Sequence, residues 1–367
     1  MQSDVLIVGG GPAGLATAIA ASLKRLRVTV IDARKPPIDK PCGEGLLPHG
    51  VAALHRLGIG LNSSLAFPFS GLQFSDEVSS VGAAFPYGRA FGVRRTVLHR
   101  LLVGRALELG VSVAWETRAL RLSPGGVHTS SGHFRYRWLV GADGDRSSVA
   151  RFARLGPRRR TRPRFGFRRH YEVAPWSDRV EVRWGNKCQL IVTPTGPGEI
   201  CVSLFTSDPR LRLDRALDRF PGVARRIAGA RPLSSEAGAV TLLSRARAVA
   251  RGNVALVGDA SCTVDGIAGH GLSLAFQQAL SLADALACGD SAKYEAAHRR
   301  IIRIPMRLTR LLLAMNASSA LRRKVLRLFA AKPALFAGMI SEHANESTAG
   351  ALGIGELLNL GWRAIWA

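Results

Sequence analysis

The pattern that most restricts the fold lies in the first 35 residues. Residues 4–8 (DVLIV) are apolar and rich in β-branched side chains, which predicts a buried strand. The glycine turn GGGPAG follows at residues 9–14, a helix is predicted over residues 15–26, and a second strand over residues 28–31. Asp32 ends the second strand. Strand, glycine turn, helix, strand and acid in this order predict an α/β unit that binds a dinucleotide.

Each conserved part of such a unit has a physical role that this chain can fill. Gly9 permits the tight turn, Gly11 lets the backbone approach a pyrophosphate, and Gly14 lets the helix pack closely on the strand. The N-terminus of the helix would face the diphosphate with free N–H groups and the positive end of its dipole. Asp32 can accept hydrogen bonds from ribose hydroxyl groups.

Two later segments repeat the form of a strand that ends in a glycine turn. LVGADGDRSSV at residues 139–149 predicts a strand, a turn and a helix, and VALVGDA at residues 254–260 predicts a strand that ends in Gly-Asp. The loop DGIAGHG at residues 265–271 then precedes a helix predicted over residues 272–287. The first fingerprint alone is compatible with either FAD or NAD, so these segments decide the cofactor.

Together the three segments resemble the flavoprotein superfamily of aromatic hydroxylases (para-hydroxybenzoate hydroxylase-like monooxygenases), flavin-dependent halogenases and geranylgeranyl reductases. The resemblance covers about residues 1–290 and implies that the cofactor is FAD. Relatives commonly have Asp where this chain has His99, four residues after the matched Arg95. The resemblance implies these cofactor-binding residues: Gly9, Gly11, Pro12, Ala13, Gly14, Asp32, Ala33, Arg34, Cys42, Gly43, Glu44, Gly45, Arg95, Asp143, Gly144, Gly258, Asp259, Gly269, His270, Gly271 and Leu272.

The string KPCGEGLLP at residues 40–48 helps to choose a branch of the superfamily. It resembles the Cys-Gly motif of the reductases and the Gly-Glu-Ser-Leu-Leu-Pro motif of the halogenases, in which this loop passes close to the flavin. Cys42 is a candidate catalytic thiol or an apolar residue that fills a tight loop. His270 is a candidate acid–base group or a turn residue bonded to backbone. The Trp-x-Trp-x-Ile-Pro string of halogenases does not occur, which disfavours halogenation.

The predicted fold class is α/β, with a Rossmann-like FAD-binding domain interleaved with an antiparallel β-sheet substrate domain and followed by a helical C-terminal tail. The FAD-binding domain is predicted over residues 1–65, 93–155 and 245–290, and the substrate domain over residues 66–92 and 156–244. Residues 165–205 alternate between apolar and polar side chains and predict hairpins. Residues 291–367 predict amphipathic helices, with Arg299, Arg303, Arg307 and Arg310 on one face.

The net charge of +25 indicates attraction to an acidic partner, although arginine-rich composition explains it equally well. The basic tail either caps the substrate domain or contacts an anionic membrane. The arginines at 158–160 form a cluster with neighbouring arginines between residues 154 and 169, which predicts a solvated loop or a landing site for an anionic carrier or the NADPH phosphate. No nucleic-acid recognition module accompanies this cluster, which disfavours nucleic acid as a partner. The five cysteines contain no CxxC pair, so we expect no metal and a cytoplasmic protein, peripheral to the inner face of the membrane if the tail binds lipid.

These observations favour an NAD(P)H-dependent monooxygenase that hydroxylates a lipophilic aromatic or polyketide-like substrate, free or carrier-bound, through a flavin C4a-hydroperoxide. NAD(P)H would bind transiently as the electron donor. The alternative is a geranylgeranyl reductase-like ene-reductase of isoprenoid lipid double bonds, which the Cys-Gly motif and the basic tail support. A non-enzymatic flavoprotein or a nucleic-acid binder is the third class.

Overall fold

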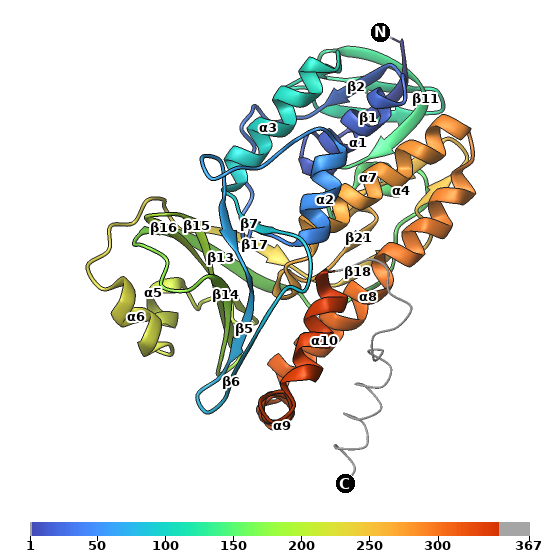
Figure 1. Ribbon diagram of the computed structural model, residues 1–367. Coiled ribbons are helices and arrows are strands. Elements are labelled where there is room, and N and C mark those ends of the chain that lie inside the picture. The colour runs from blue at the N-terminus through green and yellow to red at the C-terminus, as the bar shows by residue number, and fades with distance from the viewer. Residues whose placement is uncertain (1, 345–367) are drawn as a thin grey trace.

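The computed structural model describes residues 2–344 of the chain, and the side chains at positions 2, 157–160 and 343 lie outside that description. The last part of the predicted tail, residues 345–367, also lies outside the described residues. Figure 1 shows three parts. The first is a sheet with helices that contains the N-terminal strand, helix and strand, the second is another large sheet, and the third is a group of C-terminal helices. The predicted fold class is confirmed.

The first part is an eight-stranded sheet in the order β19-β20-β11-β1-β2-β8, which β10 and β9 extend from β11. The strands β20, β11, β1, β2 and β8 run parallel, and α1 packs between the sheet and the helices α3 and α7. The bounds are β1 Gln2–Val8, α1 Pro12–Leu23, β2 Val28–Ile31, α3 Arg95–Glu108, β8 Ser112–Ala114, β9 Ala119–Ser123, β10 Gly126–Thr129, β11 Gly132–Gly141, α4 Ser148–Phe152, β19 Ala250–Arg251, β20 Val254–Leu256 and α7 Gly271–Cys288.

Parallel strands end at one edge of the sheet, which is where the sequence motifs meet. The glycine turn follows β1, Asp32 follows β2, Asp143 follows β11 and Gly258 follows β20. These four segments are far apart in the chain, and the register of the parallel sheet brings them together. Ligands of open α/β sheets bind outside the carboxyl ends of the strands. The sheet therefore predicts the place of the site before any side chain is considered.

The second part is a seven-stranded sheet in the order β17-β13-β16-β15-β14-β5-β6. The predicted hairpins over residues 165–205 are confirmed, and the bounds are β5 Gly71–Ser75, β6 Ser80–Ala84, β13 Arg164–Glu172, β14 Arg179–Gly185, β15 Cys188–Gly196, β16 Glu199–Thr206 and β17 Ala237–Thr241. One pair departs from the antiparallel expectation, because β5 runs parallel to β14.

The aromatic segment at residues 67–91, which the sequence assigned to the substrate domain, divides between two sheets. Only β5 and β6 join the seven-stranded sheet, whereas β7 (Ala90–Gly92) pairs with both β3 (Gly45–Leu46) and β4 (Phe67–Phe69) in a separate three-stranded sheet. Gly92 explains the position of β7, since a Cβ there would lie 1.7 Å from the Pro194 carbonyl oxygen. The glycine lets β7 lie against the face of β15. Another small sheet contains β12 (Pro157–Arg160), β18 (Ser244–Ala246) and β21 (Cys262–Thr263).

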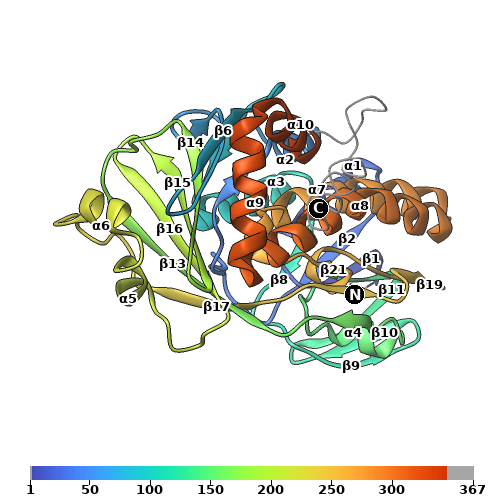
Figure 2. The same cartoon turned by 90° about the horizontal axis from the view of Figure 1, so that it is seen from below.

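Helices cover both faces of the seven-stranded sheet (Figure 2). On one face, sheet residues such as Leu190 and Leu204 pack against α5 (Leu213–Leu217) and α6 (Pro221–Ile227). On the other face, Phe74 and Trp184 pack against α8 (Ser291–Ala317), α9 (Ser319–Ala331) and α10 (Pro333–Ala344). The C-terminal helices therefore cover this second face of the seven-stranded sheet.

The arginine face predicted on the tail is present in α8. Arg299, Arg303, Arg307 and Arg310 are exposed, and the buried face of the helix carries Leu312 among its apolar residues. Contact of this face with lipid remains a prediction. Among residues 2–344, no helix is both long enough and apolar enough to cross a membrane.

Candidate active site

The glycine turn after β1 has the shape that a bound diphosphate requires. Gly9 has a φ of +114°, and a Cβ at Gly14 would lie 1.8 Å from the Gly9 carbonyl oxygen, so both positions demand glycine. Gly11 is different, because a Cβ there would meet no atom within 4 Å. Gly9 and Gly14 thus shape the turn, whereas Gly11 faces open space in front of the N-terminus of α1. This space is where a phosphate group can approach the backbone N–H groups.

The side chains of Asp32 and His99 hold the glycine turn in place through hydrogen bonds to the backbone of Gly10. Asp32 accepts a hydrogen bond from the Gly10 amide at 2.6 Å and another from the Arg34 amide at 2.7 Å. The Nε2 atom of His99 lies 2.9 Å from the Gly10 carbonyl oxygen. Burial lowers the pKa of His99, so the ring is neutral near pH 7 and Nε2–H donates this bond. His99, which departs from the common sequence of relatives, therefore has a definite part in holding the glycine turn.

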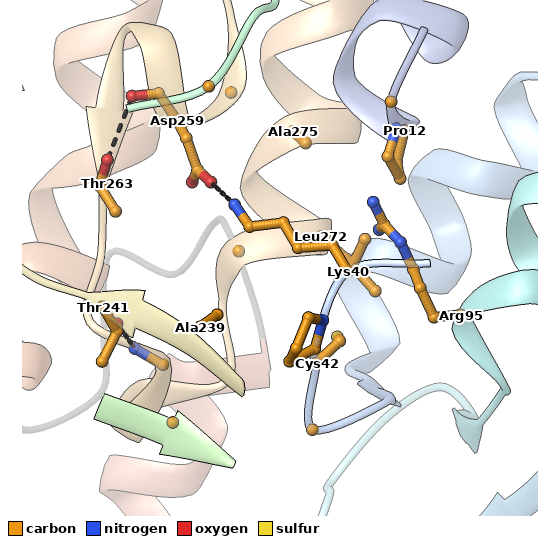
Figure 3. A pocket seen from close by; sticks show the side chains of 18 of the residues that line it. Pro12, Lys40, Cys42, Arg95, Ala239, Thr241, Asp259, Thr263, Leu272 and Ala275 are labelled. Carbon is orange, nitrogen blue, oxygen red and sulfur yellow. Dashed lines mark hydrogen bonds and ion pairs between the residues drawn. The ribbon is translucent and has the colours of Figure 1, made fainter. Parts of the chain in front are cut away.

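The ends of β11 and β20 supply the opposite side of the site. Asp143 accepts hydrogen bonds from the Ser148 amide and hydroxyl group through Oδ2, both at 2.7 Å, while its buried Oδ1 has no partner within residues 2–344. Gly258 has a φ of +62° and its amide donates to Gln278 at 2.7 Å. Asp259 forms an ion pair of 2.8 Å with Lys40, which extends across the cavity in Figure 3.

These segments enclose a cavity of about 660 Å³. One part is lined by the glycine turns and by Arg95, whose buried Nε has no partner within the described residues. The other part is apolar and is lined by side chains of the seven-stranded sheet and α8, namely Phe69, Leu72, Phe74, Val180, Val182, Ile191 and Leu312. The open space at Gly11, the free oxygen of Asp143 and the free nitrogen of Arg95 fit a dinucleotide in the first part. The second part fits an apolar molecule.

All the predicted cofactor residues line this cavity except Gly14 and His270. Gly14 packs α1 against the turn, as described above. The His270 ring is 1% exposed and its centroid lies 5.7 Å from that of His49. His270 is thus at the N-terminus of α7 as expected, but its side chain lies beside His49 and is absent from the cavity wall.

Cys42, the other candidate catalytic residue, does line the cavity. Its sulfur accepts a hydrogen bond from the Glu44 amide at 3.3 Å. Burial raises the pKa of the Cys42 thiol above its ordinary value, and the charge of Arg95 opposes this shift only in part. The sulfur therefore carries its proton at neutral pH. A protonated thiol beside a dinucleotide site can donate a proton but is a poor nucleophile.

A buried polar cluster behind Cys42 has no counterpart in the sequence predictions. Glu44 contacts the Arg168 guanidinium at 2.9 Å and His170 Nε2 at 2.6 Å, and the second guanidinium nitrogen of Arg168 contacts Asp39 at 2.8 Å. Arg168 and His170 lie two residues apart on β13, so both point to the same face of the sheet. The sequence shows the period-two alternation of β13, but it does not show which distant carboxylates Arg168 and His170 contact.

Two members of the arginine-rich stretch differ from the solvated loop or landing site that its composition suggested, whereas Arg154 and Arg162 are exposed as expected. Arg164 and Arg168 are both buried, and Arg164 forms an ion pair of 2.8 Å with buried Asp265. Their positions on a strand turn them toward the interior, where burial is tolerated because each meets a carboxylate. The side chains of residues 158–160 lie outside the described residues.

Glu44, His170 and Cys201 place three metal-ligating atoms within 4.8 Å of one another. Arg168 donates to the same carboxylate, so a positive charge already occupies one side of this group. Burial also raises the pKa of Cys201 well above the ordinary value, and a protonated thiol is a weak ligand. The donor set thus suits an ion-pair network better than a metal ion.

The chain is similar to a known protein family and to two known enzymes. Residues 2–168 match the FAD binding domain family. The chain is 30% identical to menaquinone reductase of Mycobacterium tuberculosis over 335 residues, which cover 80% of this chain and 78% of the relative. It is 28% identical to 6-methylpretetramide 4-monooxygenase of Streptomyces rimosus over 174 residues, which cover 42% of this chain and 30% of that enzyme.

A solved structure shows the same fold over nearly the whole chain. The geranylgeranyl bacteriochlorophyll reductase-like protein of Thermoplasma acidophilum superposes with a TM-score of 0.74 at 19% identity, and the match covers 98% of this chain and 95% of that one. The matched FAD binding domain contains the glycine turn, Arg95 and Asp143, and the match to the mycobacterial enzyme covers about four fifths of this chain. The chain belongs to the family of FAD-dependent oxidoreductases that includes the menaquinone reductase of Mycobacterium tuberculosis.

Proposed function

We propose that the protein is an FAD-dependent reductase that saturates a carbon–carbon double bond of an isoprenoid lipid. The observation that carries the proposal is the continuity of the cavity, in which the dinucleotide part opens directly into an apolar part lined by the seven-stranded sheet and Leu312. An isoprenoid chain has the extended apolar surface that such a wall can bury. Cys42 lies in the loop between the two parts.

The extent of the similarity to other proteins supports reduction over the monooxygenase reaction that the sequence favoured. The match to menaquinone reductase covers 80% of the chain. The match to the monooxygenase covers only 42% of the chain. Digeranylgeranylglycerophospholipid reductase 2 of Methanopyrus kandleri, at 27% identity, again covers 74% of the chain. Menaquinone and digeranylgeranylglycerophospholipid both carry isoprenoid chains.

The residues around the cavity have distinct parts in this proposal. Gly11, Asp143 and Arg95 would hold the cofactor, and the apolar wall would hold the lipid chain and exclude water. Reduced FAD supplies a hydride equivalent when bound. The Cys42 S–H bond breaks as its proton joins the second carbon of the double bond, and the thiolate that remains takes a proton from solvent before the next turnover. NAD(P)H is the proposed source of the electrons.

The test is an anaerobic single turnover of the FAD-loaded protein after chemical reduction with dithionite, with menaquinone or a geranylgeranyl lipid as substrate. We expect reoxidation of the flavin together with a product that has gained two hydrogen atoms by mass spectrometry. Chemical reduction makes the result independent of the natural electron donor. Absence of lipid reduction, together with oxygen uptake and an oxygenated aromatic product in air, would replace the proposal with the monooxygenase.

Replacing Cys42 with Ala should slow lipid reduction about 100-fold, the lower end of the contribution of a positioned acid. Binding of FAD and its reduction by dithionite should stay close to wild type, because neither step takes a proton from this thiol. Cys288→Ser is the matched control, since Cys288 is exposed and far along the chain from the cavity loop. Equal lipid reduction by the Cys42→Ala protein and the wild type would exclude the thiol as the acid.

A further inference from the structure

The loop formed by residues 39–44 carries Cys42 into the cavity and is held at both ends by one side chain. Arg168 donates from Nη1 to Oε1 of Glu44 at 2.9 Å and from Nη2 to Oδ2 of Asp39 at 2.8 Å. Arg168 belongs to β13 of the seven-stranded sheet, whereas the loop follows β2 of the parallel sheet. A single guanidinium thus ties the two large sheets together at the loop that bears the thiol.

Glu44 is the more constrained of the two loop ends. Its φ is +59°, a left-handed conformation that is unfavourable for a residue other than glycine. Its carboxylate is fully buried and receives three donors, the Arg95 amide at 3.0 Å, Arg168 Nη1 at 2.9 Å and His170 Nε2 at 2.6 Å. A buried carboxylate without donors would be very unfavourable, so these contacts hold the strained residue in place.

The constraint on Glu44 passes directly to Cys42. The Glu44 amide donates to the Cys42 sulfur at 3.3 Å, and the Glu44 carbonyl accepts from the Val93 amide at 2.9 Å. Lys40, in the same loop, bonds Asp259 at 2.8 Å on the other side of the cavity (Figure 3). Polar contacts at Asp39, Lys40 and Glu44 therefore hold the loop on both sides of Cys42.

We propose that Arg168 is a positioning residue that clamps residues 39–44 and so fixes the Cys42 thiol at the junction of the two parts of the cavity. The purpose of the clamp rests on the proposed function. Whether Arg168 holds the loop can be tested without any substrate. Arg168 takes no part in bond making. Its planar fork, with two nitrogens that bond two separate carboxylates, is a geometry that lysine cannot reproduce.

The test is the rate at which iodoacetamide alkylates Cys42 in the FAD-loaded full chain, followed by mass spectrometry of the peptide that contains it. Arg168→Gln should raise this rate about tenfold, because Cys42 is only half-exposed in the clamped loop and release of the loop exposes its thiol further. Arg169→Gln is the matched control: Arg169 is the next residue on β13 and pairs with the exposed Asp214 at 2.6 Å. It should leave Cys42 as unreactive as in the wild type.

Cys188 distinguishes positioning from general stabilisation within the same sample. It is fully buried on β15 of the same sheet, so it should stay unreactive in the Arg168→Gln protein. Alkylation of Cys188 in parallel with Cys42 would mean that the sheet had opened and would overturn the proposal. Unchanged alkylation of Cys42 would overturn it as well.

Two more variants test the bridge itself. Asp39→Asn removes one end of the clamp at a half-exposed side chain and should give a smaller rise than Arg168→Gln, whereas no rise would contradict the bridge. The Arg168→Lys protein should show an alkylation rate of Cys42 between those of the wild type and the Arg168→Gln protein. A rate equal to that of the wild type would contradict the role of the forked guanidinium, because a positive charge at position 168 would then suffice. Because labelling needs no lipid, a failure to reduce isoprenoids would count against the proposed function and leave this result standing.

Discussion

Replacing Gly11 with Asp should weaken FAD binding about 1000-fold, while the apoprotein stays nearly as stable as the wild type. A Cβ at Gly11 meets no atom within 4 Å, so the fold can accept the side chain. The carboxylate, however, would enter the space in which we place the diphosphate, and like charges brought together cost several kcal/mol, or about 1000-fold in a dissociation constant. Titration of the apoprotein with FAD, followed by quenching of flavin fluorescence, measures the change.

Two other glycines make this prediction specific. Gly14→Ala should destabilise the apoprotein itself, because the added Cβ would lie 1.8 Å from the Gly9 carbonyl oxygen. Gly104→Asp adds the same charge at a glycine of α3 that also has open space around it, and FAD affinity should be unaffected. Wild-type affinity in the Gly11→Asp protein would show that the diphosphate does not bind at this turn.

The cofactor part of the site could be predicted from the sequence because its information is local. Each strand and the turn after it are adjacent in the chain, and parallel pairing then brings Gly11, Asp143 and Gly258 to one edge. The placement of these residues needs only the order of the elements. The same reasoning gives the hairpins β14–β15 and β15–β16 of the large sheet, whose strands follow one another along the chain, but it does not give the pairing of β13 with β16.

The Arg168 cluster could not be predicted, because it depends on the contact between two separate sheets. Glu44 and Arg168 are separated by 124 positions in the sequence, and no local pattern states which residues of the parallel-sheet part will face β13. Alternation along β13 predicts that Arg168 and His170 share a face, but a basic strand also suits a solvated edge. The contact between His270 and His49 could not be predicted for the same reason, since His49 comes from a different helix.

The wild-type protein should lose about 2 kcal/mol of unfolding free energy between pH 6.5 and pH 4.5 through His298 alone, because the slope approaches about 1.4 kcal/mol per pH unit only below the unfolded pKa. Burial lowers the pKa of this histidine from 6.5 to about 3 in the folded chain. A group whose pKa is depressed by folding contributes its stability above the unfolded pKa and loses it as the pH falls toward the folded value. The ring lies on α8 with Nε2 at 3.0 Å from the Ser261 hydroxyl group, and no carboxylate of residues 2–344 forms an ion pair with it that could stabilise an added proton.

His298→Gln should remove this part of the acid sensitivity, because glutamine can keep a polar contact with Ser261 without gaining charge. Urea unfolding of the FAD-saturated protein at pH 7 and pH 4.5 measures the effect as the difference between the two pH values. His55→Gln, at an exposed position of α2 (Pro48–Arg56), is the matched control and should follow the wild-type profile. Parallel profiles for the wild type and the His298→Gln protein would mean that the ring reaches solvent, and α8 would then pack less tightly over Ser261 than its burial implies.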